Sequence, residues 1–167
     1  FDDALDLSYA VSDARAIADF AGRAGQGSYA KVHTKVVTDA EVTQQGLEAV
    51  FSEFESQIKP HDAFLFFIAG HGKTVDGRCY FLPQDFRYHN ASSITEEGLS
   101  QEIWQDWFAR IPAQRALLLY DTCESGSMTA TQTRGLELKG AIDRFAHATG
   151  RAILTASTDN QPALEGY

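Results

Sequence analysis

Three short apolar runs, each bounded by polar or turn residues, stand out in the pattern along the chain. They are AFLFFIA at 63–69, ALLLY at 116–120 and AILTA at 152–156. Continuous runs of this length are typical of parallel strands that are buried on both faces of a sheet. The segment 31–37 (KVHTKVV) alternates apolar and polar residues instead, which predicts an outer strand.

Between these runs, apolar residues recur every three and four positions, as on one face of a helix. The clearest such stripe consists of Leu47, Val50, Phe51, Phe54 and Ile58. Thr38 and Glu41 ahead of it have the spacing of a capping box. Further stripes predict helices over 103–111, with Ser100 as N-cap, and around 142–146. Strands that alternate with helices predict an α/β sandwich with a mainly parallel sheet.

An earlier helix is predicted to begin at Ser12 or Asp13 and to stop at the glycines between 22 and 27. Asp76 to Pro83, which includes Cys79, predicts a short hairpin. The polar segment 127–134 predicts a loop.

Composition limits the class of protein. With 167 residues, 44% of them hydrophobic, the chain suffices for one substantial core, so a single domain over 1–167 is predicted. The net charge of -9 leaves no basic face for nucleic acid or anionic lipid. The longest apolar run is far shorter than a membrane span, and two cysteines cannot form the disulfide framework of a small secreted domain. We therefore expect a cytoplasmic protein without nucleic-acid or membrane partners, and no structural metal.

Reactive side chains follow two of the apolar runs, in AGHG at 69–72 and DTCESG at 121–126. Ligands of a doubly wound sheet bind beyond the carboxyl ends of its strands, so His71 and Cys123 are expected to meet there. A thiolate nucleophile needs such a base. The backbone N–H groups of Gly72 and Cys123 would then form an oxyanion hole. Taken singly, a cysteine is more often a small buried side chain and a histidine a loop residue; the pair favours catalysis.

FFIAGHG (66–72) and LLLYDTCESG (117–126) resemble the two signature strands of the caspase and metacaspase superfamily, particularly its bacterial members. The histidine and cysteine are about 50 residues apart, as in caspases. Supporting matches are Asp76-Gly77, Phe81-Leu82-Pro83 with Asp85, and Ala156-Ser157-Thr158 with Gln161 and Glu165. The resemblance runs from about Leu7 to Tyr167. It implies a caspase-like three-layer α/β/α sandwich and a cysteine endopeptidase that forms a thioester acyl-enzyme, with His71 assisting Cys123 and protonating the leaving amine.

The resemblance also implies a substrate pocket. In metacaspases two aspartates bind a basic P1 side chain, and the matching positions here are Asp13 and Asp121. Neighbouring carboxylates repel one another, and a substrate Arg or Lys relieves that repulsion, which favours cleavage after Arg or Lys rather than Asp. The structural alternatives are that Asp13 caps its helix and that Asp121 bonds loop amides. Arg134 is a candidate self-processing site, with an ordinary surface loop as its alternative.

Some features depart from the family. Glu124 stands where relatives carry His or Arg, and we expect it to point to solvent, because an inward carboxylate would raise the pKa of Cys123. The family's first strand and smaller subunit have no counterpart, so we expect a large-subunit catalytic core that lacks them. A small-subunit segment, a regulatory sensor domain and a protein or peptide substrate are the expected partners, in a regulated bacterial signalling or defence pathway.

No cofactor is predicted. Calcium activates many metacaspases, and the sequence leaves this dependence open because it has no tight carboxylate cluster.

Two other functions stay open: a caspase-like scaffold without activity, and a cysteine hydrolase of non-peptide acyl groups. Retention of both His71 and Cys123 argues against the scaffold. A nucleotide-binding role is excluded for GHGKT at 70–74, because a P-loop needs glycine where the chain has Phe67.

Overall fold

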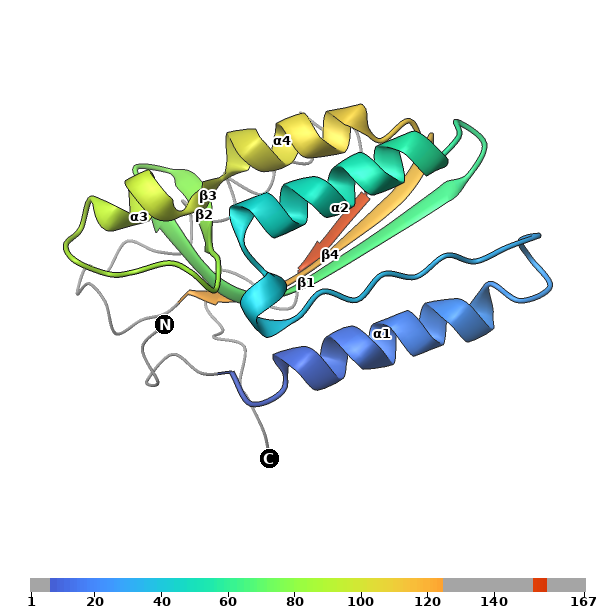
Figure 1. Ribbon diagram of the computed structural model, residues 1–167, viewed down its shortest axis with the longest axis horizontal. Coiled ribbons are helices and arrows are strands. Elements are labelled where there is room, and N and C mark those ends of the chain that lie inside the picture. The colour runs from blue at the N-terminus through green and yellow to red at the C-terminus, as the bar shows by residue number, and fades with distance from the viewer. Residues whose placement is uncertain (1–6, 125–151, 156–167) are drawn as a thin grey trace.

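A five-stranded sheet forms the centre of the computed structural model, which describes residues 7–124 and 152–155 (Figure 1). Its strand order is β3-β2-β1-β4-β5. The strands are β1 (Ala63–Val75), β2 (Arg78–Leu82), β3 (Leu99–Ser100), β4 (Arg115–Glu124) and β5 (Ala152–Thr155). β1, β4 and β5 are parallel, and β2 and β3 extend the sheet antiparallel. All three apolar runs are thus strands of one parallel core, as predicted.

Helices cover both faces of this sheet. α2 (Gln44–Gln57) and α4 (Gln101–Arg110) lie side by side on one face, and α1 (Ala10–Ala24) lies on the other (Figure 1). A short α3 (Ser93–Glu97) comes before β3. The three-layer α/β/α sandwich expected from the sequence is confirmed.

The main core fills the space between the sheet and the α2–α4 pair. Phe51 of α2 packs against Trp107 and Phe108 of α4, each with a ring-centroid distance of 5.2 Å. From the sheet, even-numbered residues of β1 and β4 such as Phe64 and Leu118 complete the cluster. Burying one large apolar side chain contributes about 1.5–3 kcal/mol, so this layer fixes β1 and β4 relative to each other.

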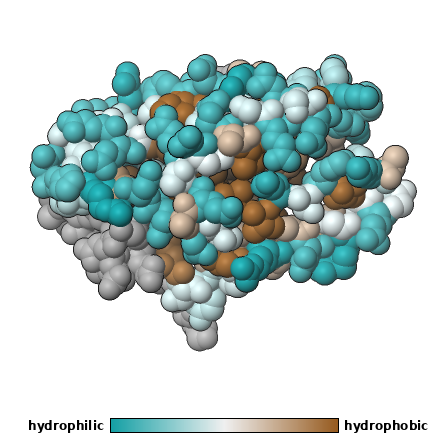
Figure 2. All heavy atoms as spheres, in the orientation of Figure 1, coloured by the Kyte–Doolittle hydropathy of each residue, from teal (hydrophilic) through white to brown (hydrophobic). Residues whose placement is uncertain are grey.

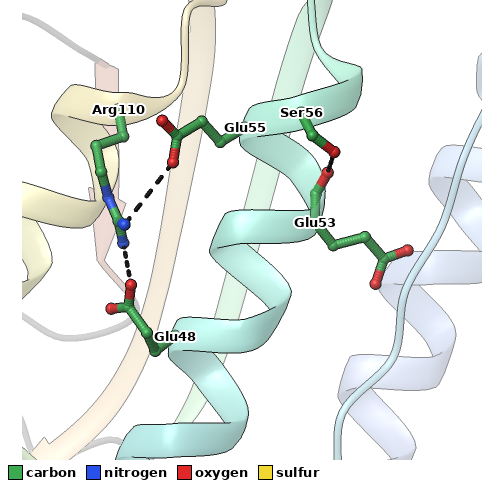
Figure 3. Close-up of polar contacts among 5 residues, drawn as sticks. All are labelled: Glu48, Glu53, Glu55, Ser56 and Arg110. Atoms are coloured by element: carbon green, nitrogen blue, oxygen red, sulfur yellow. Dashed lines mark hydrogen bonds and ion pairs between the residues drawn. The ribbon is translucent and has the colours of Figure 1, made fainter.

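A polar bridge also joins the two helices (Figure 3). Arg110 of α4 contacts Glu48 at 2.7 Å and Glu55 at 3.7 Å, both on α2. Ser56 donates to the carbonyl of Glu53 in the same helix at 2.7 Å. Because the ion-pairing side chains are about a third or more exposed, they contribute little next to the apolar layer.

Two predicted helix starts are wrong by a few residues. α1 begins at Ala10 with Tyr9 as N-cap, ahead of Ser12 and Asp13, and ends at Ala24 with Gly25 as C-cap, as expected from the glycines. The first turn carries no side-chain cap bond, so no sequence signal marks it.

The predicted capping box is also wrong. α2 begins at Gln44, and the hydroxyl of Thr43 accepts a hydrogen bond from the Gly46 N–H at 3.0 Å. Thr38 instead precedes a short 3₁₀ helix, Asp39–Glu41, without a side-chain cap bond. Thr43, directly before the apolar stripe, is the N-cap instead, because its hydroxyl accepts a hydrogen bond from a free N–H group of the first turn.

The segment 31–37 is not a strand, contrary to prediction. It runs as an extended chain between α1 and β1 in the view of Figure 1, and no strand of the described sheet pairs with it. β2 pairs with β1 only over His71–Val75, so among the residues that the structure describes no strand pairs with β1 over 63–70 on that side. A groove of about 1130 Å³, lined by α1, α2, β1 and this segment, lies along the edge. The alternating pattern suits a strand, but pairing needs a neighbour within reach.

Apolar side chains gather on this face between α1 and α2 (Figure 2). Leu65 and Leu117, which line the groove, are 38% and 41% exposed. The predicted helix around 142–146 and the loop at 127–134 lie outside the described residues. Within residues 7–124 and 152–155, no helix is both long and apolar enough to cross a bilayer.

Candidate active site

Parallel pairing of β1 with β4 joins the two sequence signatures. In the register of these strands His71 is the partner of Cys123, Ala69 of Asp121, and Gly72 of Glu124. Paired strands lie about 4.8 Å apart, so the backbones of His71 and Cys123 are direct neighbours. The arrangement expected from the order of the apolar runs is therefore present at the level of the backbone.

Both strands continue beyond the ends of their apolar runs. β1 passes through the GHG motif to Val75 because β2 folds back on it as a hairpin. The turn, Asp76-Gly77, has φ of 51° and 72°, which matches the two positive φ angles of a type I′ turn. His71 thus lies inside a strand held by pairs on both sides, and its alternative placement in a loop is wrong.

The glycine before His71 is required by close packing. A Cβ atom on Gly70 would overlap the aromatic ring of Phe81, which belongs to the buried core. Gly72 has more room, since an added Cβ would lie 3.3 Å from the Cβ of Thr122. Gly70 therefore lets β1 lie close to the Phe81 ring at the point where the strand carries His71.

His71 is only 8% exposed and lies on the α1 side of the sheet. Side chains alternate along a strand, so His71 faces away from Phe64 and Ile68, which belong to the core under α2 and α4. Leu82 of β2 is its partner in the antiparallel register.

The two predicted pocket residues come from different layers. Asp121 is half-buried in β4, two residues before Cys123, and so on the same strand face. Asp13 is half-buried in α1, which packs on β1. The N-cap of α1 is Tyr9, so the alternative in which Asp13 caps its helix is wrong.

Cys79, the other cysteine, lies in the predicted hairpin and away from this register. It is the partner of Thr74 on β1, with 3.7 Å between the hydroxyl oxygen and the sulfur. Tyr120, on the core side of β4, interacts electrostatically with Cys79. Burial raises the pKa of the Tyr120 phenol well above 10.0, and Cys79 adds to the rise.

Two further predictions concern self-processing and metal binding. Arg134, the candidate self-processing residue, lies outside the described residues. In the part of the chain that the structure describes, no three His, Cys, Asp or Glu side chains are grouped closely enough to hold a metal ion.

The structure is thus a parallel α/β/α core in which a histidine and a cysteine are register partners on adjacent strands. The family model described as the caspase domain matches residues 1–165, so the chain belongs to the caspase domain family of peptidases. None of the curated proteins matches it significantly. Membership makes the chain a cysteine peptidase in general, a hydrolase whose substrate is protein, and confirms the family resemblance.

Sequence reasoning missed one residue beside the site. Lys73 follows His71 by two positions in β1 and is 7% exposed, although lysine is among the side chains least often buried. Because side chains alternate along a strand, a prediction that β1 continues past Ala69 would have placed Lys73 on the same face as His71.

Proposed function

We propose that the chain is the catalytic core of a cysteine endopeptidase with Cys123 as nucleophile and His71 as its base. The pairing of His71 with Cys123 in the β1–β4 register is the observation that carries this proposal. His71 takes the thiol proton as the Cys123 sulfur adds to the scissile carbonyl carbon, and the Gly72 and Cys123 N–H groups donate to the oxyanion. The C–N bond breaks as His71 gives that proton to the leaving amine. His71 then takes a proton from water as the water oxygen adds to the thioester carbon; the C–S bond breaks, the acid is released, and His71 returns the proton to the Cys123 sulfur.

The pocket is proposed to accept Arg or Lys at P1. Asp121 is on the strand that carries the nucleophile, and Asp13 is on the helix that covers the same side of the sheet. Two half-buried carboxylates there favour a substrate cation, which removes their mutual repulsion. A guanidinium can also bond one carboxylate with two parallel hydrogen bonds.

The chain is further proposed to be the large-subunit part of a longer enzyme. The open β1 edge over 63–70 supports an additional first strand, since a strand in the groove would find backbone partners there. A small-subunit segment would complete the substrate site, a sensor domain would control it, and Arg134 would be a self-processing site. The setting proposed is the cytoplasm, in a bacterial signalling or defence pathway.

A panel of fluorogenic peptides that differ only in Arg, Lys or Asp at P1 tests the pocket. With the full-length protein we expect turnover of the Arg and Lys peptides. Asp121→Asn should lower kcat/KM for the Arg peptide at least about tenfold, because a charge-assisted hydrogen bond contributes about 1.5–3 kcal/mol. Asp106→Asn, an exposed carboxylate on α4, is the matched control and should leave kcat/KM unchanged. Preferred cleavage of the Asp peptide would contradict the pocket and leave the peptidase intact.

A further inference from the structure

The chain between α1 and α2 contains a stretch, residues 26–36, in which every residue is exposed. A turn follows α1, in which the Ser28 and Tyr29 N–H groups donate to the carbonyl of Gly25. From 30 to 37 the chain is extended, and within the described residues no backbone hydrogen bond holds it and no strand pairs with it. A peptidase binds its substrate as an extended, accessible chain, so this segment already has the conformation of a substrate.

Lys31 and Lys35 are the basic residues of this segment, and the other arginines and lysines that the structure describes are less accessible to a peptidase. Lys35 forms an ion pair with Glu53 at 3.4 Å, whereas Lys31 has no ion pair among the described residues. Six of the others lie inside helices or strands: Arg15, Arg23, Lys73, Arg78, Arg110 and Arg115.

The two remaining basic residues are held in turns. Lys59 precedes Pro60, and its N–H donates to the Asp62 carboxylate at 2.8 Å. The N–H of Arg87 donates to the carboxylate of Glu97 at 2.9 Å. Of the described basic residues, Lys31 is therefore the one that combines an extended, unpaired backbone with an unengaged side chain.

The position of Lys31 separates it from the proposed site of its own chain. The turn after α1 lies at the end of the sheet where β1 begins (Figure 1). His71 follows Ala63, the first residue of β1, by eight residues, a distance of about 26 Å at 3.3 Å per residue. Because α1 and α2 anchor the segment at both ends, a cut at Lys31 requires the active site of a second copy.

We propose that the peptide bond between Lys31 and Val32 is a self-cleavage site that a second copy of the enzyme hydrolyses, and that the cut lowers activity. The inference rests on the proposed function, because it takes the enzyme to cleave after basic residues. The Lys31 carbonyl carbon passes from the Val32 nitrogen to the sulfur of the second copy and then to a water oxygen. The products are a carboxylate on Lys31 and a free amine on Val32.

The cut separates two parts of the proposed site. Asp13, the proposed pocket residue on α1, precedes the cut, whereas His71 follows it. None of the residues of α1 is buried, so its contacts with the sheet remove little apolar surface from water. Without the covalent link, α1 is expected to leave the sheet together with Asp13.

Incubation of the full-length wild type with isotope-labelled, full-length Cys123→Ala protein tests the cleavage. Mass spectrometry should find a new N-terminus at Val32 in the labelled chain, at a rate proportional to the wild-type concentration. Lys31→Gln in the labelled chain should abolish this cut, and Lys31→Arg should keep it. Lys59→Gln, at an exposed lysine followed by proline, is the matched control and should be cut after Lys31 like its parent.

Turnover of a fluorogenic Arg peptide tests the effect on activity. It should fall at least about tenfold as the wild type is cut, because the pocket loses a charged partner of the substrate. The Lys31→Gln enzyme should keep its activity over the same time. Equal activity of cut and intact enzyme would contradict the inactivation.

A labelled chain that stays intact after Lys31, while the wild type hydrolyses the Arg peptide, would overturn this inference and keep the proposed function. A cut in Cys123→Ala protein incubated alone would assign the cleavage to another peptidase and would also overturn it. Absence of both the cut and peptide hydrolysis in the wild type would remove the proposed function as well.

Discussion

At the residue scale, the sheet separates two chemical environments. Tyr120 faces the aromatic core, where burial disfavours its ionised form, with Cys79 as a further cause of its raised pKa. His71 and Lys73 face the α1 side, which is polar at the carboxyl ends of β1 and β4. The same pair of strands therefore supplies a dry supporting face and the face that carries the proposed active site.

The raised pKa of Tyr120 predicts a loss of stability in alkali. Below pH 10 the phenol is neutral in both the folded and unfolded states, so it adds no pH dependence. Above pH 10 it ionises in the unfolded state first, so the free energy of unfolding falls as pH rises toward the folded pKa. Tyr120→Phe should remove about 1 kcal/mol of this loss at pH 11.

Urea unfolding at pH 8 and pH 11 measures the effect, compared with Tyr88→Phe, an exposed tyrosine. Equal alkaline losses in the wild type and Tyr120→Phe would show that the phenol does not stay protonated in the folded protein.

At the element scale, the β1–β2 hairpin determines where His71 lies. The Asp76-Gly77 turn folds β2 back, and Phe81 of β2 packs over Gly70 at the position before the histidine. The helix layer of α2 and α4, with its buried aromatic rings, packs on one face of β1 and β4. The segment that carries His71 is thus held by strand pairing and by side-chain packing.

Gly70→Ala should destabilise the protein by about 1–3 kcal/mol, because the new methyl group overlaps the buried Phe81 ring and the core must shift. Gly22→Ala is the matched control, since an added Cβ in α1 meets no atom within 4 Å. That change should stabilise the protein by about 0.5–1 kcal/mol through helix propensity. Urea denaturation of both variants measures the difference. Equal stability of Gly70→Ala and wild type would mean that the hairpin is not packed this closely.

The sequence predicts the elements whose hydrophobic pattern lies within their own residues. It misses the features that depend on pairing with another strand. The runs at 63–69 and 116–120 predicted strands because apolar residues cover both faces of each. The end of β1 was not predictable from its own residues, since β2 pairing extends it. α3 and β3 are too short to show a period. For the same reason the order of the two apolar runs predicted the pairing of His71 with Cys123, whereas the strand position of Lys73 depends on the full length of β1.

At the scale of the whole molecule, the chain is an acidic α/β/α domain of the caspase domain family with an open groove along one edge of its central strand. The groove extends along β1 to His71, so whatever completes the sheet there would lie next to the proposed site. Segment 31–37 was mispredicted as a strand because its alternating pattern is local, whereas strand pairing depends on the rest of the sheet, and no strand of the described sheet pairs with it.

Peptide hydrolysis by the full-length protein and three of its variants tests the central claim most directly. Cys123→Ala and His71→Ala should each lower kcat by at least about a hundredfold, since nucleophile and base act in the same step. Cys79→Ala, which removes the other thiol, should retain turnover. Undiminished hydrolysis in Cys123→Ala or His71→Ala would contradict the account. Absence of hydrolysis in the wild type, with protein binding retained, would instead identify a scaffold.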